Sequence, residues 1–243
     1  MFNDVELSSF VNKKSSIVFD GKINGKLFLN QLNEKFEGES SLIISSLKSN
    51  SQLIGDAKLN LIASEDLKKI DLDFLIINNE QEKLKLFGDF SIEKNTYPLN
   101  LTLQSNDFSI SPFSNLIKNS ITDFEGVFNS EIKITGNSSR PVFYGNIVTS
   151  NVAFKVPYLN VRYEIDDKST FFLNDQSFYI DDFLIKNKLT NTTGNISGKI
   201  THNLFKNWFL ELDINSNNLL ILNTQLNNNS LYYGKGMFDG NAI

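Results

Sequence analysis

The stretch that decides the fold is Ile17–Asn30, which reads IVFDGKINGKLFLN. Its odd-numbered positions hold Ile, Phe, Leu or Gly, whereas the even-numbered positions from Asp20 to Lys26 hold Asp, Lys or Asn. Because successive side chains of a strand point to opposite faces, this spacing gives the strand one apolar and one polar face. The chain offers no long amphipathic helix to cover the apolar face. The sheet must therefore fold back on itself, pair with another copy, or leave an apolar groove.

The same alternation returns along the rest of the chain, at the 8 to 12 residue spacing typical of meandering antiparallel sheets. Polar turn segments such as Ser49–Ser51 and Asn78–Glu80 separate the expected strands. The expected strands are residues 16–29, 53–63, 70–77, 84–92, 99–103, 126–136, 142–149, 152–156, 159–165, 171–173, 178–185, 195–200, 208–214 and a final run near Tyr232. We predict an all-β protein, in which an elongated, curved, meandering antiparallel sheet forms a U-shaped, solenoid-like groove.

At most one short helix is expected, near residues 111–119. Ser111 suits its N-cap and Pro112 its first position, and Phe113, Leu116 and Ile117 follow at the spacing of one helical stripe. A helix of this length is too short to cover a sheet of more than a dozen strands. It is expected to plug one end of the groove or to turn a corner.

Composition excludes several classes of function. The 243 residues are 40% apolar and 21% charged, which is typical of a folded protein, and 21 of them are Phe. The net charge of -5 gives no electrostatic reason to expect a nucleic-acid partner, since binding to phosphates needs clustered Lys and Arg. Without cysteine there is no disulfide or thiolate metal site. No apolar run approaches the roughly 18 residues of a membrane-spanning helix.

No linker rich in Pro, Gly or Ser interrupts the strands, so residues 1–243 are predicted to form one continuous β segment. The segment contains a loose repeat, 5–107 and 108–243. Leu7–Phe10 followed by Phe19–Gly25 is echoed by Ile110–Phe113 followed by Phe124–Gly136. The last residues, from Gly234, resemble the opening of another strand, which favours a segment of a longer protein.

Glycines recur inside the expected strands, often at apolar positions, as at Gly25, Gly88 and Gly198. Glycine in a strand marks a bulge, a bend or a close approach, so these positions favour curvature, with or without a ligand in the resulting groove. The apolar positions on the same strand parity are the candidate lipid-groove residues. They are Ile17, Phe19, Ile23, Leu27, Leu59, Leu61, Leu72, Phe74, Leu86, Phe90, Leu101, Leu103, Phe128, Ile132, Ile134, Phe143, Ile147, Phe154, Val161, Tyr163, Ile165, Ile196, Ile200, Leu210, Leu212 and Ile214.

The chain is poor in catalytic constellations. His202 is the only histidine, and no nucleophile elbow accompanies it, so a structural or surface role is favoured. Asp166–Asp167 and Asp181–Asp182 could bind calcium or act as an acid/base pair, but acidic residues at strand ends are ordinary turn residues. The sequence predicts no enzyme, no catalytic residue, no metal site and no cofactor.

A more specific pattern begins with Gly136–Ile147, which reads GNSSRPVFYGNI, and continues through Val152–Leu159 and Val161–Asp167. Asn207–Trp208 and the run Leu219–Thr224 follow in the same order. This order resembles the β-rich region of the TamB-like proteins, the translocation and assembly module family of Gram-negative envelopes, which is related to AsmA. The resemblance is clearest from Phe124 to Ile243 and rests on the order of the motifs.

The resemblance implies a non-enzymatic lipid conduit, whose apolar groove carries phospholipid acyl chains between the inner and outer membranes and supports assembly of outer-membrane proteins. It also implies a periplasmic segment of a parent protein that is anchored in the inner membrane and pairs with an outer-membrane β-barrel assembly protein. Two alternatives remain open. One is a closed β-solenoid or adhesin passenger without lipid cargo, and the other is a carbohydrate-active β-helix enzyme.

Overall fold

The computed structural model describes residues 1–10, 18–32, 35–92, 98–116, 120–204, 206–226 and 233–242. These residues form one antiparallel sheet of fifteen strands, which follow one another in chain order except that β11 pairs with β12 and β9 off the main path. The prediction of an all-β fold with meandering antiparallel strands is confirmed.

The strands are β1 (Phe2–Glu6), β2 (Phe19–Leu32), β3 (Lys35–Ser49), β4 (Gln52–Ala63), β5 (Lys69–Asn78), β6 (Gln81–Ser91), β7 (Pro98–Ser109), β8 (Thr122–Asn137), β9 (Arg140–Val156), β10 (Val161–Ile165), β11 (Thr170–Asp175), β12 (Ser177–Asn187), β13 (Thr192–Asn203), β14 (Lys206–Thr224) and β15 (Gly234–Ala242). Two short 3-10 helices are η1 (Leu7–Ser9) and η2 (Ser111–Leu116). The second lies where the sequence predicts a short helix, although Ile117 is outside the described residues.

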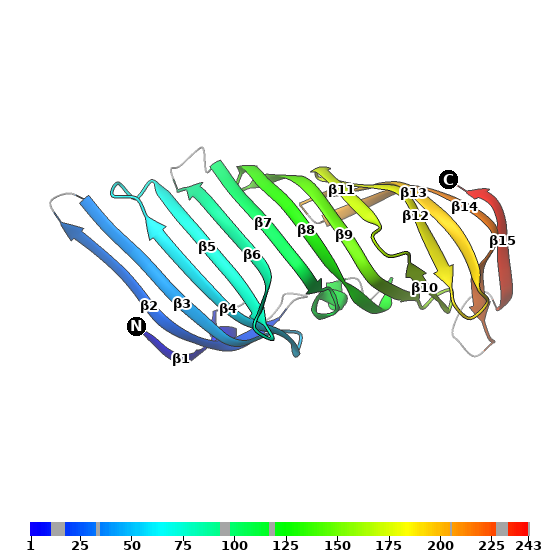
Figure 1. The fold of residues 1–243 in the computed structure, drawn as a ribbon, viewed down its shortest axis with the longest axis horizontal. Coiled ribbons are helices and arrows are strands. Elements are labelled where there is room, and N and C mark those ends of the chain that lie inside the picture. Colours follow the sequence, from blue (N-terminus) through cyan, green and yellow to red (C-terminus); the bar gives the residue numbers. More distant parts are fainter. Residues whose placement is uncertain are drawn as a thin grey trace. The chain divides into compact units, whose positions relative to one another are not determined.

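The described chain divides into two compact units, each with its own strands. Unit 1 comprises residues 1–108 and 129–145, and unit 2 comprises residues 109–128 and 146–243. In unit 1, strands β2 to β6 lie side by side in chain order (Figure 1). Each unit is described below by itself.

Unit 1 has one apolar and one polar face, because its strands keep their register. Residues that pair directly across neighbouring strands share a face. One such row crosses five strands and consists of Leu42, Leu59, Phe74, Leu86 and Leu103. The opposite face carries charged pairs, among them Lys85 with Asp73 at 3.5 Å and Lys69 with Asp89 at 3.4 Å. We call the face with the leucine row the apolar face of unit 1.

The side chains on the apolar face of unit 1 differ in exposure from place to place. Strands β2 to β4 shift register through bulges, for example between Ile44 and Leu47, and bulges bend and twist a sheet. Beside them the side chains of Ile23 and Ile76 are buried, whereas Leu27, further along β2, is 66% exposed. The exposure of the apolar face thus varies along β2, from buried at Ile23 beside the bulge to exposed at Leu27.

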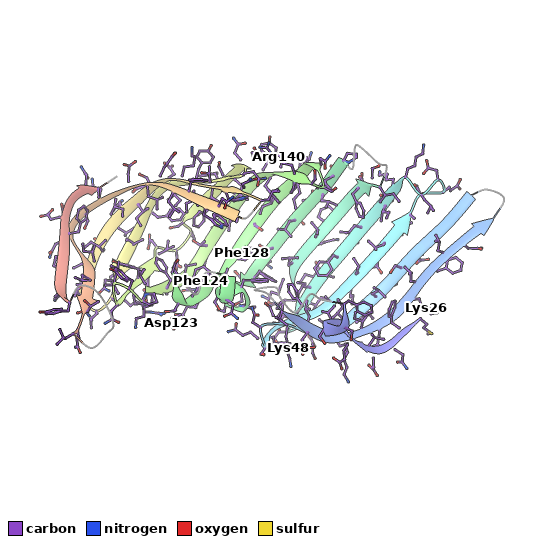
Figure 2. The ribbon with its side chains drawn as sticks, turned by 180° about the vertical axis from the view of Figure 1, so that it is seen from behind. Lys26, Lys48, Asp123, Phe124, Phe128 and Arg140 are labelled. Atoms are coloured by element: carbon purple, nitrogen blue, oxygen red, sulfur yellow. The ribbon has the colours of Figure 1, made fainter. Side chains whose placement is uncertain are left out.

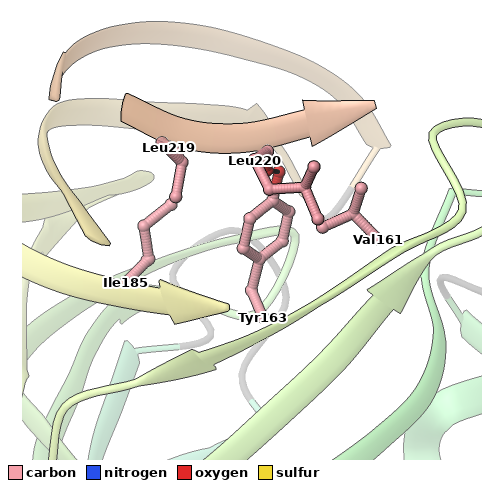
Figure 3. Packing of buried hydrophobic residues seen from close by; sticks show 5 residues of the cluster. All are labelled: Val161, Tyr163, Ile185, Leu219 and Leu220. Carbon is pink, nitrogen blue, oxygen red and sulfur yellow. Dashed lines mark hydrogen bonds between the residues drawn. The ribbon is translucent and has the colours of Figure 1, made fainter. Parts of the chain in front are cut away.

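In unit 2 the end of β14 returns onto β10 and β12, where it closes the main hydrophobic cluster of the described residues (Figure 3). The cluster consists of Val161, Tyr163, Ile185, Leu219 and Leu220. Three polar contacts fix this closure. The hydroxyl of Tyr163 donates to the carbonyl of Leu220 at 2.8 Å, the backbone N–H of Asn223 donates to the carbonyl of Leu159 at 2.9 Å, and Nδ2 of Asn160 donates to the carbonyl of Asn223 at 2.7 Å.

One local arrangement occurs twice within unit 1 with the same contacts. The backbone N–H of Asp4 donates to Oδ1 of Asn24 at 2.9 Å, and Nδ2 of Asn24 donates to Oδ1 of Asp4 at 3.1 Å. Asp107 and Asn129 make the same two hydrogen bonds at 2.9 and 3.1 Å. Both aspartates have positive φ angles, of 50° and 44°. In unit 2, Asn218 has a φ of 73° at an equivalent bulge between Ser216 and Leu219.

Candidate functional site

The strongest candidate site is the apolar face of each unit, because its side chains are held in place but left partly accessible. In unit 1 the register places Ile23, Leu27, Leu59, Leu61, Leu72, Phe74, Leu86, Phe90, Leu101 and Leu103 on one face, as the alternation predicts. Strand β8 shows the same alternation, since Ile132 is buried, Lys133 is exposed and Ile134 is half-buried. In unit 2, Phe154 pairs with Tyr163 and Ile196 with Ile214, and we call the face that carries these four residues the apolar face of unit 2.

The predicted lining residues fall into three groups by exposure. Ile23, Leu101, Ile132, Val161 and Tyr163 are buried, and Leu27 and Leu210 are exposed. The others are half-buried: Phe19, Leu59, Leu61, Leu72, Phe74, Leu86, Phe90, Leu103, Phe128 (labelled on β8 in Figure 2), Ile134, Phe143, Ile147, Phe154, Ile165, Ile196, Ile200, Leu212 and Ile214. Ile17 lies outside the described residues. Half-buried apolar side chains keep area that a further apolar body can cover.

Unit 2 contains an apolar pocket of about 330 Å³. Four of its lining residues, Phe154, Tyr163, Ile196 and Ile214, belong to the predicted set. Sequence reasoning did not select the other lining residues, which are Val156, Leu159, Ile185, Leu219, Ile221, Phe238 and Ala242. The run Leu219–Leu222 is the signal that could have found part of them, because four successive apolar residues cannot all face water on a two-faced strand.

Of the three ways in which the sequence allows the apolar face to be covered, unit 2 shows the first at one place, where the sheet folds back on itself. Leu219 and Leu220 are 2% and 1% exposed and pack against Val161 and Tyr163. The apolar pocket lies beside this closure and shares Tyr163 and Leu219 with it. The structure therefore combines a sealed segment and an accessible pocket on one apolar surface.

Burial favours the neutral forms of two ionisable groups, Tyr163 and His202. Burial raises the pKa of the Tyr163 hydroxyl to about 12, because the phenolate would lose its hydration. Burial lowers the pKa of His202, an effect that the charge of Asp175 partly opposes. The imidazole of His202 lies 4.8 Å from the ring of Trp208 and 5.6 Å from that of Phe178. His202 is thus a buried residue among aromatic rings, in agreement with the structural role that the sequence favours.

The aspartate pairs hold strand ends and bulges together. Asp167 accepts a 2.7 Å hydrogen bond from the backbone N–H of Asn151, and Asp182 accepts one of 2.5 Å from Nδ2 of Asn195. Asp167 agrees with the interpretation as an ordinary turn residue, whereas the interpretation is wrong for Asp181 and Asp182, which lie inside β12 at the bulge between Ile180 and Phe183. In the described part of the chain, no three acidic or histidine side chains gather as metal ligands. No helix formed by the described residues has the length and apolarity to span a membrane.

Comparison of the chain with protein-family models, with curated proteins and with solved structures found no match in any of the three.

Proposed function

We propose that the apolar faces of the two units bind the acyl chains of phospholipids, as a non-enzymatic lipid-conduit segment of a TamB-like envelope protein. The observation that carries the proposal is the cross-strand row of half-buried apolar side chains in unit 1. The opposite, polar face of the same strands carries charged pairs. The apolar pocket of unit 2 supports it, since small-molecule sites are concave and mostly apolar.

The energetics suit a weakly held, mobile chain. Burial of a CH₂ group contributes about 0.8 kcal/mol, so even part of an acyl chain gains several kcal/mol from apolar contact alone. The rows of Leu, Ile and Phe offer many similar contacts and few directional ones. An acyl chain can therefore slide from one contact to the next without a large energy barrier. Transport requires such movement, whereas a site that binds one lipid tightly would prevent it.

The cellular setting of the proposal follows from the family resemblance. The segment lies in the periplasm, in a parent protein that is anchored in the inner membrane and pairs with an outer-membrane β-barrel assembly protein. There it carries phospholipid between the two membranes and supports assembly of outer-membrane proteins.

The sharpest test uses two phenylalanines that face opposite ways on neighbouring strands. Phe74 lies in the apolar row, paired with Leu59 and Leu86, whereas Phe87 pairs with Asp73 and Thr102 on the polar face. A photocrosslinking benzoylphenylalanine is placed at one or the other position in cells. We expect phospholipid adducts, detected by mass spectrometry, at Phe74 and not at Phe87.

Equal labelling at both positions, or no adduct at Phe74 together with a protein that purifies free of lipid, would contradict the proposal. That result would favour the second candidate function, a closed structural or adhesin segment without lipid cargo. The observation in favour of this alternative is the closure of the unit 2 cluster by Leu219 and Leu220.

A further inference from the structure

The apolar pocket of unit 2 has a buried floor and an open mouth. Tyr163, Ile185 and Leu219 line it and also belong to the closed hydrophobic cluster, where they are at most 5% exposed. The side chains of Leu219 and Ile185 point toward one another there (Figure 3). Two other lining residues, Ile221 and Ala242, are exposed. The pocket is therefore closed where it meets the cluster and open at Ile221 and Ala242.

The lining of the apolar pocket is suited to hydrocarbon. Of the described residues that line it, none is charged, and the hydroxyl of Tyr163 already donates to the carbonyl of Leu220. Asp213 and Asn215 flank Ile214 on β14 and line a separate, polar pocket. Because successive side chains of a strand alternate, those two side chains lie on the opposite face of the sheet. A ligand in the apolar pocket is thus recognised by its hydrocarbon part alone.

The volume of the pocket limits the length of chain that it can hold. A protein cavity of ~150 Å³ accommodates the six carbons of benzene, so about 330 Å³ has room for roughly a dozen carbons. A charged headgroup would lose its hydration in such a pocket, so the methyl end of the chain enters first and the headgroup stays outside.

We propose that the apolar pocket binds the methyl end of a single acyl chain, up to about twelve carbons, whatever headgroup that chain carries. The inference rests on the proposed function and adds its selectivity. The closure by Leu219 and Leu220 is the wall at which the chain stops. Unit 2 therefore discriminates between lipids by the length of their chains and not by their headgroups.

The test places a fluorescent reporter at the mouth of the pocket in the full chain. The chain has no cysteine, so Ala242→Cys can be labelled at one position with acrylodan, whose emission responds to apolar ligands. Fatty acids of 8 to 16 carbons, and monoacylglycerols of the same lengths, are titrated below their critical micelle concentrations. We expect affinity to rise about fourfold with each added CH₂ up to about twelve carbons, and to stay constant beyond that. The charged and the uncharged series should reach their limit at the same length.

Matched variants separate the pocket from its surroundings. Asn241→Cys is the control for the reporter, because its side chain lies on the opposite face of β15 and its label should not respond. Ile196→Phe enlarges a lining side chain and should move the limit to shorter chains. Ile200→Phe, on the same face of β13 but outside the pocket, should leave the limit unchanged. Tryptophan fluorescence during thermal unfolding of the unlabelled variants shows that each is folded.

The outcomes distinguish the inference from the proposed function. Affinity that keeps rising to 16 carbons, or a limit that Ile196→Phe does not move, would overturn the closed pocket and leave the proposed function standing. Different limits in the two series would overturn binding without regard to the headgroup. Absence of any response from the reporter would overturn the inference, and if native mass spectrometry also finds no lipid on the purified chain, the proposed function falls with it.

Discussion

Tyr163 brings a hydroxyl group into an apolar cluster, and its hydrogen bond to the carbonyl of Leu220 joins β10 to the end of β14. Replacement by Phe removes the donor and leaves that carbonyl without it. We expect Tyr163→Phe to lower the free energy of unfolding by about 1–3 kcal/mol at pH 8, the cost of an unsatisfied buried polar group. Urea unfolding followed by tryptophan fluorescence measures this loss.

The raised pKa of Tyr163 gives this difference a pH dependence. In the folded protein the pKa of the hydroxyl is about 12, whereas in the unfolded chain it is near 10. The contribution of Tyr163 to stability is therefore complete below pH 10 and declines as the pH rises towards 12. The difference in the free energy of unfolding between the unmodified protein and Tyr163→Phe should become smaller between pH 8 and pH 11. A constant difference would contradict the burial of the Tyr163 hydroxyl.

The lowered pKa of His202 predicts a loss of stability as the pH falls. Burial lowers its pKa, so the unfolded chain takes up a proton near pH 6.5 while the folded protein still excludes it. Its contribution to stability is complete above pH 6.5 and is lost as the pH falls below that value. Because His202 is the only histidine, unfolding curves of His202→Gln between pH 7 and pH 5 isolate the effect. The variant should lose less stability than the unmodified protein over this range.

At the scale of the element, the pairing of β6 with β7 depends on Gly88. Its φ of 132° is one that side-chain-bearing residues rarely adopt, and an added Cβ would overlap the carbonyl oxygen of Asn100 on β7. Gly88→Ala should therefore cost about 1–3 kcal/mol in urea unfolding. Gly236→Ala is the control. Gly236 has no such φ, and an added Cβ would lie 3.2 Å from its nearest neighbour, the Cβ of Leu222. Equal losses of unfolding free energy in the two variants would show that neither the φ of Gly88 nor the approach of the Asn100 carbonyl causes the loss.

The period-two alternation predicted most strands and their faces correctly, but it missed β1 and β3 and divided β9 into two strands. The apolar face of β3 carries Gly38 and Ser40 beside Leu42 and Ile44, so the alternation of polar and apolar residues is weak there. The bulge at Ser46, where φ is 53°, then places Ile44 and Leu47 at an odd spacing on the same side. Counting by twos fails across such a bulge, because one inserted residue reverses the parity of everything that follows.

The candidate site was predictable to the same extent. Alternation identified which side chains share a face, because the direction of a side chain follows from its position along its own strand. It did not identify that Leu219 and Leu220 fold back onto Val161 and Tyr163, because this contact joins residues more than fifty positions apart.

At the scale of the whole molecule, the hydrogen-bonded pair of Asp and Asn occurs twice and marks a sequence repeat along the chain. Residues 3–10 read NDVELSSF and residues 106–113 read NDFSISPF, and a 3-10 helix begins within each segment. The equivalent bulge at Asn218 opens a third copy, in which Leu219 pairs with Phe238 as Val5 pairs with Ile23. A repeat in which every copy presents an apolar face to the same kind of ligand predicts several equivalent binding places rather than one.

This multiplicity can be measured as lipid stoichiometry. Phe74→Glu places a charge in the apolar face of unit 1, and Ile214→Glu places one in the apolar pocket of unit 2. Because each unit has its own apolar face, either variant alone should lower the number of phospholipids that native mass spectrometry finds on the chain without abolishing binding. The double variant should carry none, and Phe87→Glu, on the polar face, should carry as many as the unmodified protein. Complete loss of lipid in one single variant would instead mean a single site in that unit.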